Sequence, residues 1–138
     1  MSHWFKRTAD CPSSWCGIGY GKSGNNSRFT WGLRGNYSII TLWGDDNFQT
    51  QNGLINDDEW HHFLTTYDGV DKVVQYLDGK KIWEWSTGTT STAWQYIHVG
   101  DPWESYACNG RFADFYIYDR VLRDYEIQQL FEAKTVGE

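Results

Sequence analysis

The sequence has little of what would mark several common classes of protein. It holds only two Pro and one Met among 138 residues, and no apolar run reaches the length of a membrane span. Twelve Lys and Arg stand against 18 Asp and Glu, for a net charge of −6, which makes a nucleic-acid backbone a poor partner. The first residues, from Met1 to Lys6, also lack the apolar segment of a signal peptide. We therefore expect a soluble, acidic, globular chain.

Cysteine is also scarce, and its odd number leaves the pairing open. Cys11 and Cys16 are close enough in sequence to staple a short loop, which would leave Cys108 free. Alternatively, Cys108 pairs with one of them, or all three thiols stay reduced. The spacing offers neither a nearby His nor a second ligand pair, so it does not favour a zinc site.

Aromatic residues and turn formers are abundant instead. Phe, Trp and Tyr make up 18% of the chain and 14 Gly supply turns, a mixture that favours strands. Asp78-Gly79 predicts a tight hairpin turn, because type I′ turns need positive φ angles. Short apolar runs bounded by Gly, Asn or Asp predict strands at residues 3–8, 15–20, 27–33, 37–43, 59–67, 72–77, 81–86, 96–99 and 111–118. In the last of these, alternation predicts Phe112 and Phe115 on opposite faces.

The hydrophobic period changes near the end of the chain. Leu122, Ile127, Leu130 and Phe131 are spaced for one stripe of a helix, which we predict over residues 124–133. Neither a linker nor an internal repeat interrupts the pattern. The prediction is one all-β domain over residues 1–138, an antiparallel β-sandwich with a short C-terminal helix.

The order of several short motifs resembles a known family. The chain is similar to a laminin-G-like domain of the concanavalin A-like lectin/glucanase superfamily over roughly residues 2–132, and pentraxins show a similar succession. The motifs are Glu59-Trp60-His61-His62-Phe63, Tyr67-Asp68-Gly69, Gln75-Tyr76-Leu77-Asp78-Gly79-Lys80, Ile97-His98-Val99-Gly100, Asn109-Gly110-Arg111-Phe112 and the run from Tyr116 to Leu122. This resemblance implies a concanavalin A-like jelly roll.

The resemblance also implies a role and a location. Members of the family most often recognise carbohydrate or a protein partner in adhesion, without catalysis. The expected setting is a secreted or cell-surface protein of which this chain is one part. The opening strands of the family are missing here, and Arg123 stands where a Ser, Thr or Asp usually caps the helix. A second subunit that covers the exposed sheet edge would give a homo-oligomer.

Catalysis finds little support in the residue pattern. Related glucanases carry carboxylates at alternate positions of one strand, and no such pattern occurs. Asp45-Asp46 and Asp57-Asp58-Glu59 are runs of neighbours, which we interpret as solvated residues near turns. His61-His62 cannot grip one metal ion together, because adjacent strand residues point to opposite faces. We therefore expect a protein that is not an enzyme.

Two clusters of loop residues are suited to sugar binding. A pyranose ring stacks its C–H face on Trp or Tyr, while Asp and Asn bond its hydroxyls. Loops on a rigid scaffold are also where binding residues concentrate. The candidate residues are Trp15, Trp43, Asp45, Asn47, Trp103, Tyr106 and Asn109. Carbohydrate binding through them is the favoured function, and the alternatives are protein–protein adhesion, with the same aromatics as anchors, or structural assembly.

Calcium is the metal that the sequence favours. Ca²⁺ prefers several oxygen ligands, and loops between strands can supply them. The segment that contains Asp101 and Glu104 corresponds to a calcium-binding loop in pentraxins, and Asp10 lies in a second loop. The hypothesis is therefore a Ca²⁺ site formed by Asp10, Asp101 and Glu104 that assists recognition.

Overall fold

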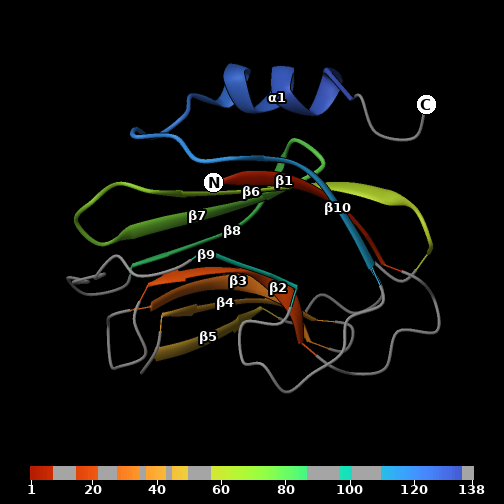
Figure 1. Cartoon of the computed structure of the whole chain (residues 1–138). Helices are drawn as coiled ribbons and strands as arrows, with labels where there is room; N and C mark the ends of the chain where they lie inside the picture. The colour runs from red at the N-terminus through yellow and green to blue at the C-terminus, as the bar shows by residue number, and fades with distance from the viewer. Residues whose placement is uncertain are drawn as a thin grey trace. The chain divides into compact units, whose positions relative to one another are not determined.

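The computed structural model describes residues 1–7, 15–21, 28–34, 37–42, 45–49, 57–86, 97–100 and 110–134. These residues form antiparallel strands and one short helix (Figure 1). The elements are β1 (Ser2–Arg7), β2 (Trp15–Gly21), β3 (Arg28–Arg34), β4 (Tyr37–Leu42), β5 (Asp45–Gln49), β6 (Trp60–Tyr67), β7 (Lys72–Leu77), β8 (Lys80–Ser86), β9 (Ile97–Gly100), β10 (Gly110–Tyr116) and α1 (Asp124–Glu132). The predicted fold class, mostly β and antiparallel with a short C-terminal helix, is confirmed.

The strands form two sheets, with the orders β10-β1-β6-β7-β8 and β5-β4-β3-β2-β9. Each predicted strand is present, with ends displaced by at most two residues from the prediction. β5 was missed, because Asp45, Asp46 and Asn47 are residues that favour turns. The chain divides into two compact units: residues 1–6, 59–89 and 111–138 form the first, and residues 7–58 and 90–110 form the second.

The hairpin between β7 and β8 has the turn that the sequence predicts. Asp78 and Gly79 have φ angles of +50° and +74°, so both occupy the left-handed region that a type I′ turn requires. The Asp78 carboxylate also fastens this turn to β6, since its Oδ1 accepts the backbone N–H of His62 at 2.9 Å. A Cβ at Gly79 would also crowd the helix, at 3.3 Å from Cβ of Phe131 and 2.6 Å from Oε1 of the flexible Gln128 side chain.

The helix packs on one face of the first sheet. Leu64, Val74 and Tyr76 from β6 and β7 form a buried cluster with Leu122 and Ile127, and Ile127 is fully buried. Figure 1 shows α1 lying across this face. The apolar stripe predicted from the sequence spacing, which includes Leu122 and Ile127, is thus the face that packs on the sheet.

The opposite face of this sheet carries aromatic rings. Phe5 packs against Phe63 and Phe112, with ring centroids 6.3 and 4.9 Å apart. The ring of His3 contacts both Phe112 and Phe115, at 5.9 and 6.4 Å. The prediction that Phe112 and Phe115 lie on opposite faces is therefore wrong. Asp114 between them has a φ of +50°, and this left-handed residue interrupts the alternation of β10.

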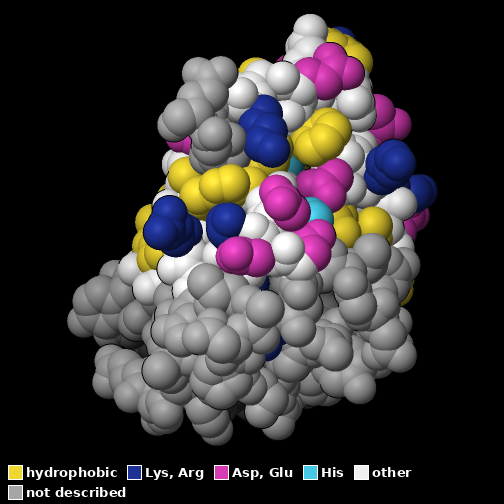
Figure 2. All heavy atoms as spheres, turned by 90° about the vertical axis from the view of Figure 1, so that its right-hand side faces the viewer, with side chains coloured by type: hydrophobic (Ala, Val, Ile, Leu, Met, Phe, Trp, Pro, Cys, Tyr) yellow, Lys and Arg dark blue, Asp and Glu magenta, His cyan; other side chains and the backbone are white. Residues whose placement is uncertain are grey.

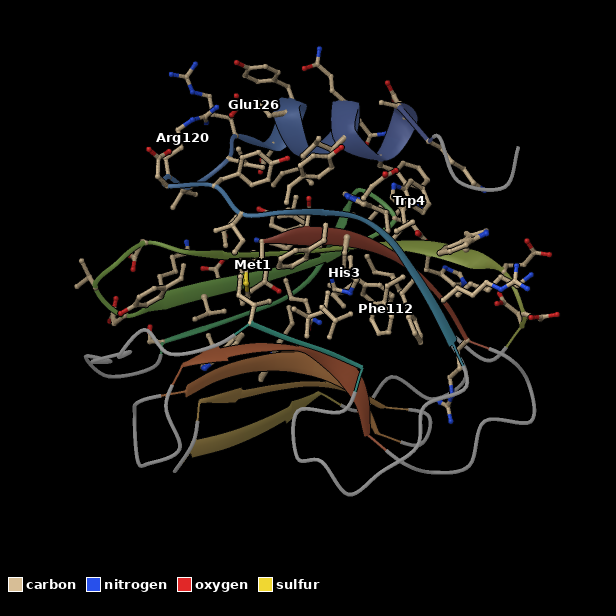
Figure 3. All side chains as sticks on the ribbon, in the orientation of Figure 1. Met1, His3, Trp4, Phe112, Arg120 and Glu126 are labelled. Atoms are coloured by element: carbon tan, nitrogen blue, oxygen red, sulfur yellow. The ribbon has the colours of Figure 1, made fainter. Side chains whose placement is uncertain are left out.

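A charged network replaces the helix cap that the sequence lacks. The backbone N–H of Arg123 donates to Oε2 of Glu126 at 2.8 Å, as in a capping box. The Arg120 guanidinium holds both oxygens of the same carboxylate, at 2.6 and 2.7 Å (Figure 3). These hydrogen bonds, chiefly those from Arg120, lower the pKa of Glu126 to about 2. Arg123 is therefore tolerated at the N-cap position because Glu126, in the first turn of the helix, accepts the backbone N–H of Arg123.

The second unit contains the sheet β5-β4-β3-β2-β9. Its strands pair antiparallel with continuous registers, and Ile18 in β2 is buried. β5 and β9 are the outer strands of this sheet as described. The registers therefore determine which strand ends lie side by side, and those ends carry the segments singled out from the sequence.

Candidate binding sites

Most of the residues predicted to bind sugar or calcium lie outside the described part of the chain. The predicted residues there are Asp10, Trp43, Asp101, Trp103, Glu104, Tyr106 and Asn109. Cys11 and Cys108 also lie outside it, whereas Cys16 lies in β2. Among the described residues, no group of three His, Cys, Asp or Glu side chains is arranged to hold a metal ion.

The remaining predicted residues, Trp15, Asp45 and Asn47, are not brought together. Trp15 pairs with Arg34 at the start of β2, and Arg34 in turn pairs with Tyr37. Asp45 pairs with Leu42 at the other end of β4, on a strand separated from β2 by β3 and β4. Trp15 and the Asp45–Asn47 pair therefore belong to different ends of the sheet.

The register of β2 with β9 has a consequence for the predicted loop site. Gly100, the last residue of β9, pairs with Gly17, two residues after Trp15 at the start of β2. Because the two strands are antiparallel neighbours, β2 begins and β9 ends at the same end of the sheet. The sequence before Trp15 contains Asp10, and the sequence after Gly100 contains Asp101, Trp103 and Glu104.

The two adjacent histidines have separate structural partners. The ring of His62 is buried among Trp4 and Phe131, at centroid distances of 5.1 and 6.5 Å. Nδ1 of His61 lies 2.8 Å from Oδ2 of Asp78, in the turn described above. Figure 3 shows Trp4 on the helix side of β1 and His3 on the other side. Burial lowers the pKa of His62 to about 4, partly offset by Asp78, and lowers that of His3 to about 3.

The acidic run at residues 57–59 precedes β6 and is exposed. Asp57 and Asp58 form a bend, and Asp58 has a φ of +61°. Figure 2 shows acidic side chains gathered beside a histidine on one face of the described surface.

No helix among the described residues is long and apolar enough to cross a membrane.

A groove that sequence reasoning missed lies on the helix side of the first sheet. It has a volume of about 560 Å³, within the range of small-molecule sites. Its lining comes from β6, β7, β8, the two hairpin turns that join them, the segment before the helix and the first turns of α1. The buried lining residues are Thr66, Val74, Tyr76 and Leu122, whereas Lys72, Lys81 and Glu84 line the exposed part.

The charges in this groove are paired with one another. One oxygen of Glu84 lies 2.8 Å from Nζ of Lys72, and the other lies 3.2 Å from Nζ of Lys81. The hydrogen bond with Lys72 is the main cause that lowers the pKa of Glu84 and raises that of Lys72. The Tyr76 hydroxyl donates to Oδ1 of Asp124 at 3.2 Å, and burial is the main cause that raises the pKa of Tyr76 to about 12.

One further carboxylate of the groove holds its own turn in place. Oδ1 of Asp68 accepts the backbone N–H groups of Val70, Asp71 and Lys72, at 2.8 to 3.0 Å. These hydrogen bonds lower the pKa of Asp68, with that from Val70 the largest cause. Gly69, the other residue of this turn, has a φ of +83°. The Tyr67-Asp68-Gly69 motif thus builds a rigid end for the groove.

Comparisons with known proteins identify one matching family model and several solved structures of similar fold. No curated protein matches the chain. A laminin G family model, described as the concanavalin A-like lectin/glucanases superfamily, matches residues 1–128. Among solved structures, the binding domain of Paraclostridial Mosquitocidal Protein 1 is 17% identical with a TM-score of 0.70, over 94% of this chain and 35% of that chain.

Botulinum neurotoxin binding domains are similar as well. That of neurotoxin DC in complex with SialylT is 20% identical with a TM-score of 0.70, over 96% of this chain and 34% of that chain. The same domain in complex with rat synaptotagmin II is 18% identical with a TM-score of 0.66, over the same shares. The chain thus spans about a third of these neighbours, and such identities show a shared fold alone.

Proposed function

Because the chain belongs to the concanavalin A-like lectin/glucanase superfamily, as its motifs predict, we propose that it is a non-catalytic module that recognises carbohydrate. The proposed contacts are the aromatic and polar residues of its loops. Its proposed setting is an extracellular protein of which it forms one part.

The observation that supports this proposal most strongly is the pairing of Gly17 with Gly100. It puts the start of β2, where Trp15 stands, and the end of β9 at the same end of the sheet. Trp103, Tyr106 and Asn109 follow β9 directly in the sequence. Indole and phenol rings offer stacking surfaces, and the Asn amide offers both a donor and an acceptor for sugar hydroxyls.

A second group of predicted contacts belongs to the β4–β5 hairpin. β4 ends at Leu42 and β5 begins at Asp45, so Trp43 lies in the connection between them. Asp45 and Asn47 follow within β5. This second group belongs to the other end of the sheet from Trp15, so a sugar bound there would be a separate ligand.

We propose Ca²⁺ as an aid to the first group. Asp10 precedes β2 and Asp101 and Glu104 follow β9, so their segments leave the sheet at neighbouring strand ends. Carboxylate oxygens are the ligands that Ca²⁺ prefers. A bound ion would neutralise these acidic residues and order the two segments for recognition.

A protein ligand is the second candidate function. Two of the similar structures are complexes of one toxin domain, with SialylT in one and with rat synaptotagmin II in the other. Carbohydrate is favoured for this chain because Trp43 stands close in sequence to Asp45 and Asn47, and Trp103 to Asn109. The structure corrects the prediction that Trp15, Asp45 and Asn47 are loop residues, since they lie in β2 and β5.

Binding of the purified chain to an immobilised glycan array tests the proposal. We expect binding that a free sugar competes away and that Trp103→Ala and Tyr106→Ala reduce at least about fivefold, since loss of one stacked ring removes on the order of 1 kcal/mol or more. Tyr125→Ala is the matched control, because Tyr125 is exposed on α1. An array with no competed signal, together with capture of a protein ligand that the same Trp103 and Tyr106 variants abolish, would replace carbohydrate with the second candidate.

A further inference from the structure

We infer that the groove beside α1 is a second ligand site, and that it takes a neutral oligosaccharide. It shares no residue with the loop contacts proposed above, and Trp15, Asp45 and Asn47 are absent from its lining. The inference shares the ligand class of the proposed function but rests on a different part of the chain.

The lining of the groove combines an apolar base with a polar rim. Val74 and Leu122 are buried but border the groove, and Val121 is exposed at its edge. Such aliphatic surface suits the C–H face of a sugar ring. The rim supplies donors from Lys72 and Lys81 and acceptors from Asp124 and Gln128, so hydroxyl groups of a ligand find partners of both kinds.

The charge arrangement selects a neutral ligand over an anionic one. Each oxygen of Glu84 is engaged by one lysine, and with Asp68 and Asp124 the lining holds three carboxylates against two lysines, a net charge of −1. An anionic ligand would have to break the pairs of Glu84 and would also meet Asp124 and Asp68. A hydroxyl-rich neutral molecule adds hydrogen bonds without disturbing any pair, which is the physical basis of the selectivity.

The walls of the groove are held in place by contacts that need no ligand. Asp68 fixes the β6–β7 turn through three backbone N–H groups, and Gly79 allows the β7–β8 turn to approach Gln128. The bond from Tyr76 to Asp124 joins the sheet to the start of the helix. A preformed site of this kind loses little conformational entropy on binding.

Amide NMR spectra of the whole chain give a residue-specific test. The probes are a panel of neutral disaccharides and trisaccharides that includes lactose, with sialyllactose as the anionic counterpart of lactose. We expect a neutral member to shift the amide signals of Val74, Leu122 and Gln128, with affinity at least about fivefold higher than for its sialylated form. Val121→Trp should fill the edge of the groove and weaken this binding at least tenfold, as an estimate from lost cavity access.

Matched variants separate the groove from the loops. Val70→Trp is the control for Val121→Trp, because Val70 is exposed beside the groove but does not line it. Glu84→Gln removes the carboxylate that pairs with both lysines, so the preference for lactose over sialyllactose should fall. Trp103→Ala should leave the groove shifts unchanged.

Several results would overturn the inference. One is the absence of groove shifts with every neutral sugar, and another is equal binding by Val121→Trp and Val70→Trp. Unchanged selectivity in Glu84→Gln would refute the charge argument. If glycan-array binding depends on Trp103 while the groove signals stay fixed, the groove site fails and the proposed loop function stands. If the groove signals shift while Trp103→Ala has no effect on any binding, the loop proposal fails instead.

Discussion

Acidification from pH 7 to pH 5 should destabilise the fold through two buried histidines. His3 and His62 lie on opposite faces of the first sheet and are each about 3% exposed. Their folded-state pKa values are lowered to about 3 and about 4, from a model-peptide value of 6.5. Burial is the main cause for both; the positive charges of His62 and the chain's amino group lower the pKa of His3 further, whereas Asp78 partly raises that of His62.

The sign and size of the effect follow from proton linkage. Between pH 6.5 and the lowered pKa values of the two histidines in the folded chain, the unfolded chain binds more protons than the folded chain. The free energy of unfolding therefore falls as the pH falls. A pH of 5 lies about 1.5 units below the pKa of a histidine in the unfolded chain. The free energy of unfolding therefore falls by about 2 kcal/mol for each histidine and by about 4 kcal/mol for both. This is a large share of the roughly 5–15 kcal/mol that holds a typical domain together. The full contribution is present above pH 6.5.

Urea unfolding followed by Trp fluorescence at pH 7 and pH 5 measures this loss. His62→Phe keeps an aromatic ring against Trp4 and Phe131 but removes one titrating group, so the loss should fall by about 2 kcal/mol. His3→Phe should do the same on the other face. Part of the loss remains in both variants because burial also lowers the pKa of the Met1 amino group to about 6. The carboxylates contribute little in this window, because ordinary Asp and Glu values of 3.8 and 4.5 lie below it. A stability that stays constant from pH 7 to pH 5, or a loss equal in His62→Phe and the unaltered chain, would refute the assignment.

Three further predictions concern packing, a turn and the metal. Ile127→Ala should cost about 2–5 kcal/mol in urea unfolding, because Ile127 is fully buried under the helix, and a cost below about 1 kcal/mol would show that the helix is not firmly docked. Gly79→Ala should destabilise the chain more than Gly69→Ala: both have positive φ, which costs about 1 kcal/mol, but only at Gly79 does the new Cβ meet the helix, 3.3 Å from Cβ of Phe131. Equal losses in thermal melts of the two variants would contradict the close approach. Excess Ca²⁺ should raise the melting temperature relative to EGTA, by the equivalent of about 2.7 kcal/mol at a hundredfold excess over the dissociation constant, and Asp101→Asn should abolish the rise. A melting temperature indifferent to Ca²⁺ would remove the metal from the proposed mechanism.

The sequence by itself determined the fold class, most of the strand positions and the family. Alternating apolar residues and turn signals act over short distances, so they can be read without knowing what packs against them. Asp78-Gly79 shows this, since its turn depends on two residues alone and formed as predicted. The spacing of Leu122 and Ile127 likewise determined the buried stripe of the helix.

The failures are residues whose conformation depends on neighbours far away in sequence. The residue types of Asp45-Asp46-Asn47 predict a turn, yet this segment pairs with β4 and forms a strand. A left-handed Asp114 brings Phe112 and Phe115 to the same ring of His3, against simple alternation.

The loop positions and the groove beside α1 differ in how far the sequence predicts each of them. Residue chemistry singled out Trp103, and the family resemblance singled out Asp101. The register of β2 with β9 added that their segment starts beside the start of β2. No local pattern predicts the groove, because Lys72, Glu84 and Asp124 meet only after β7, β8 and α1 have packed. Individually these are ordinary exposed charges. Only the tertiary structure decides that Glu84 pairs with two lysines beside an apolar base, because that arrangement depends on strand register and helix docking rather than on sequence spacing.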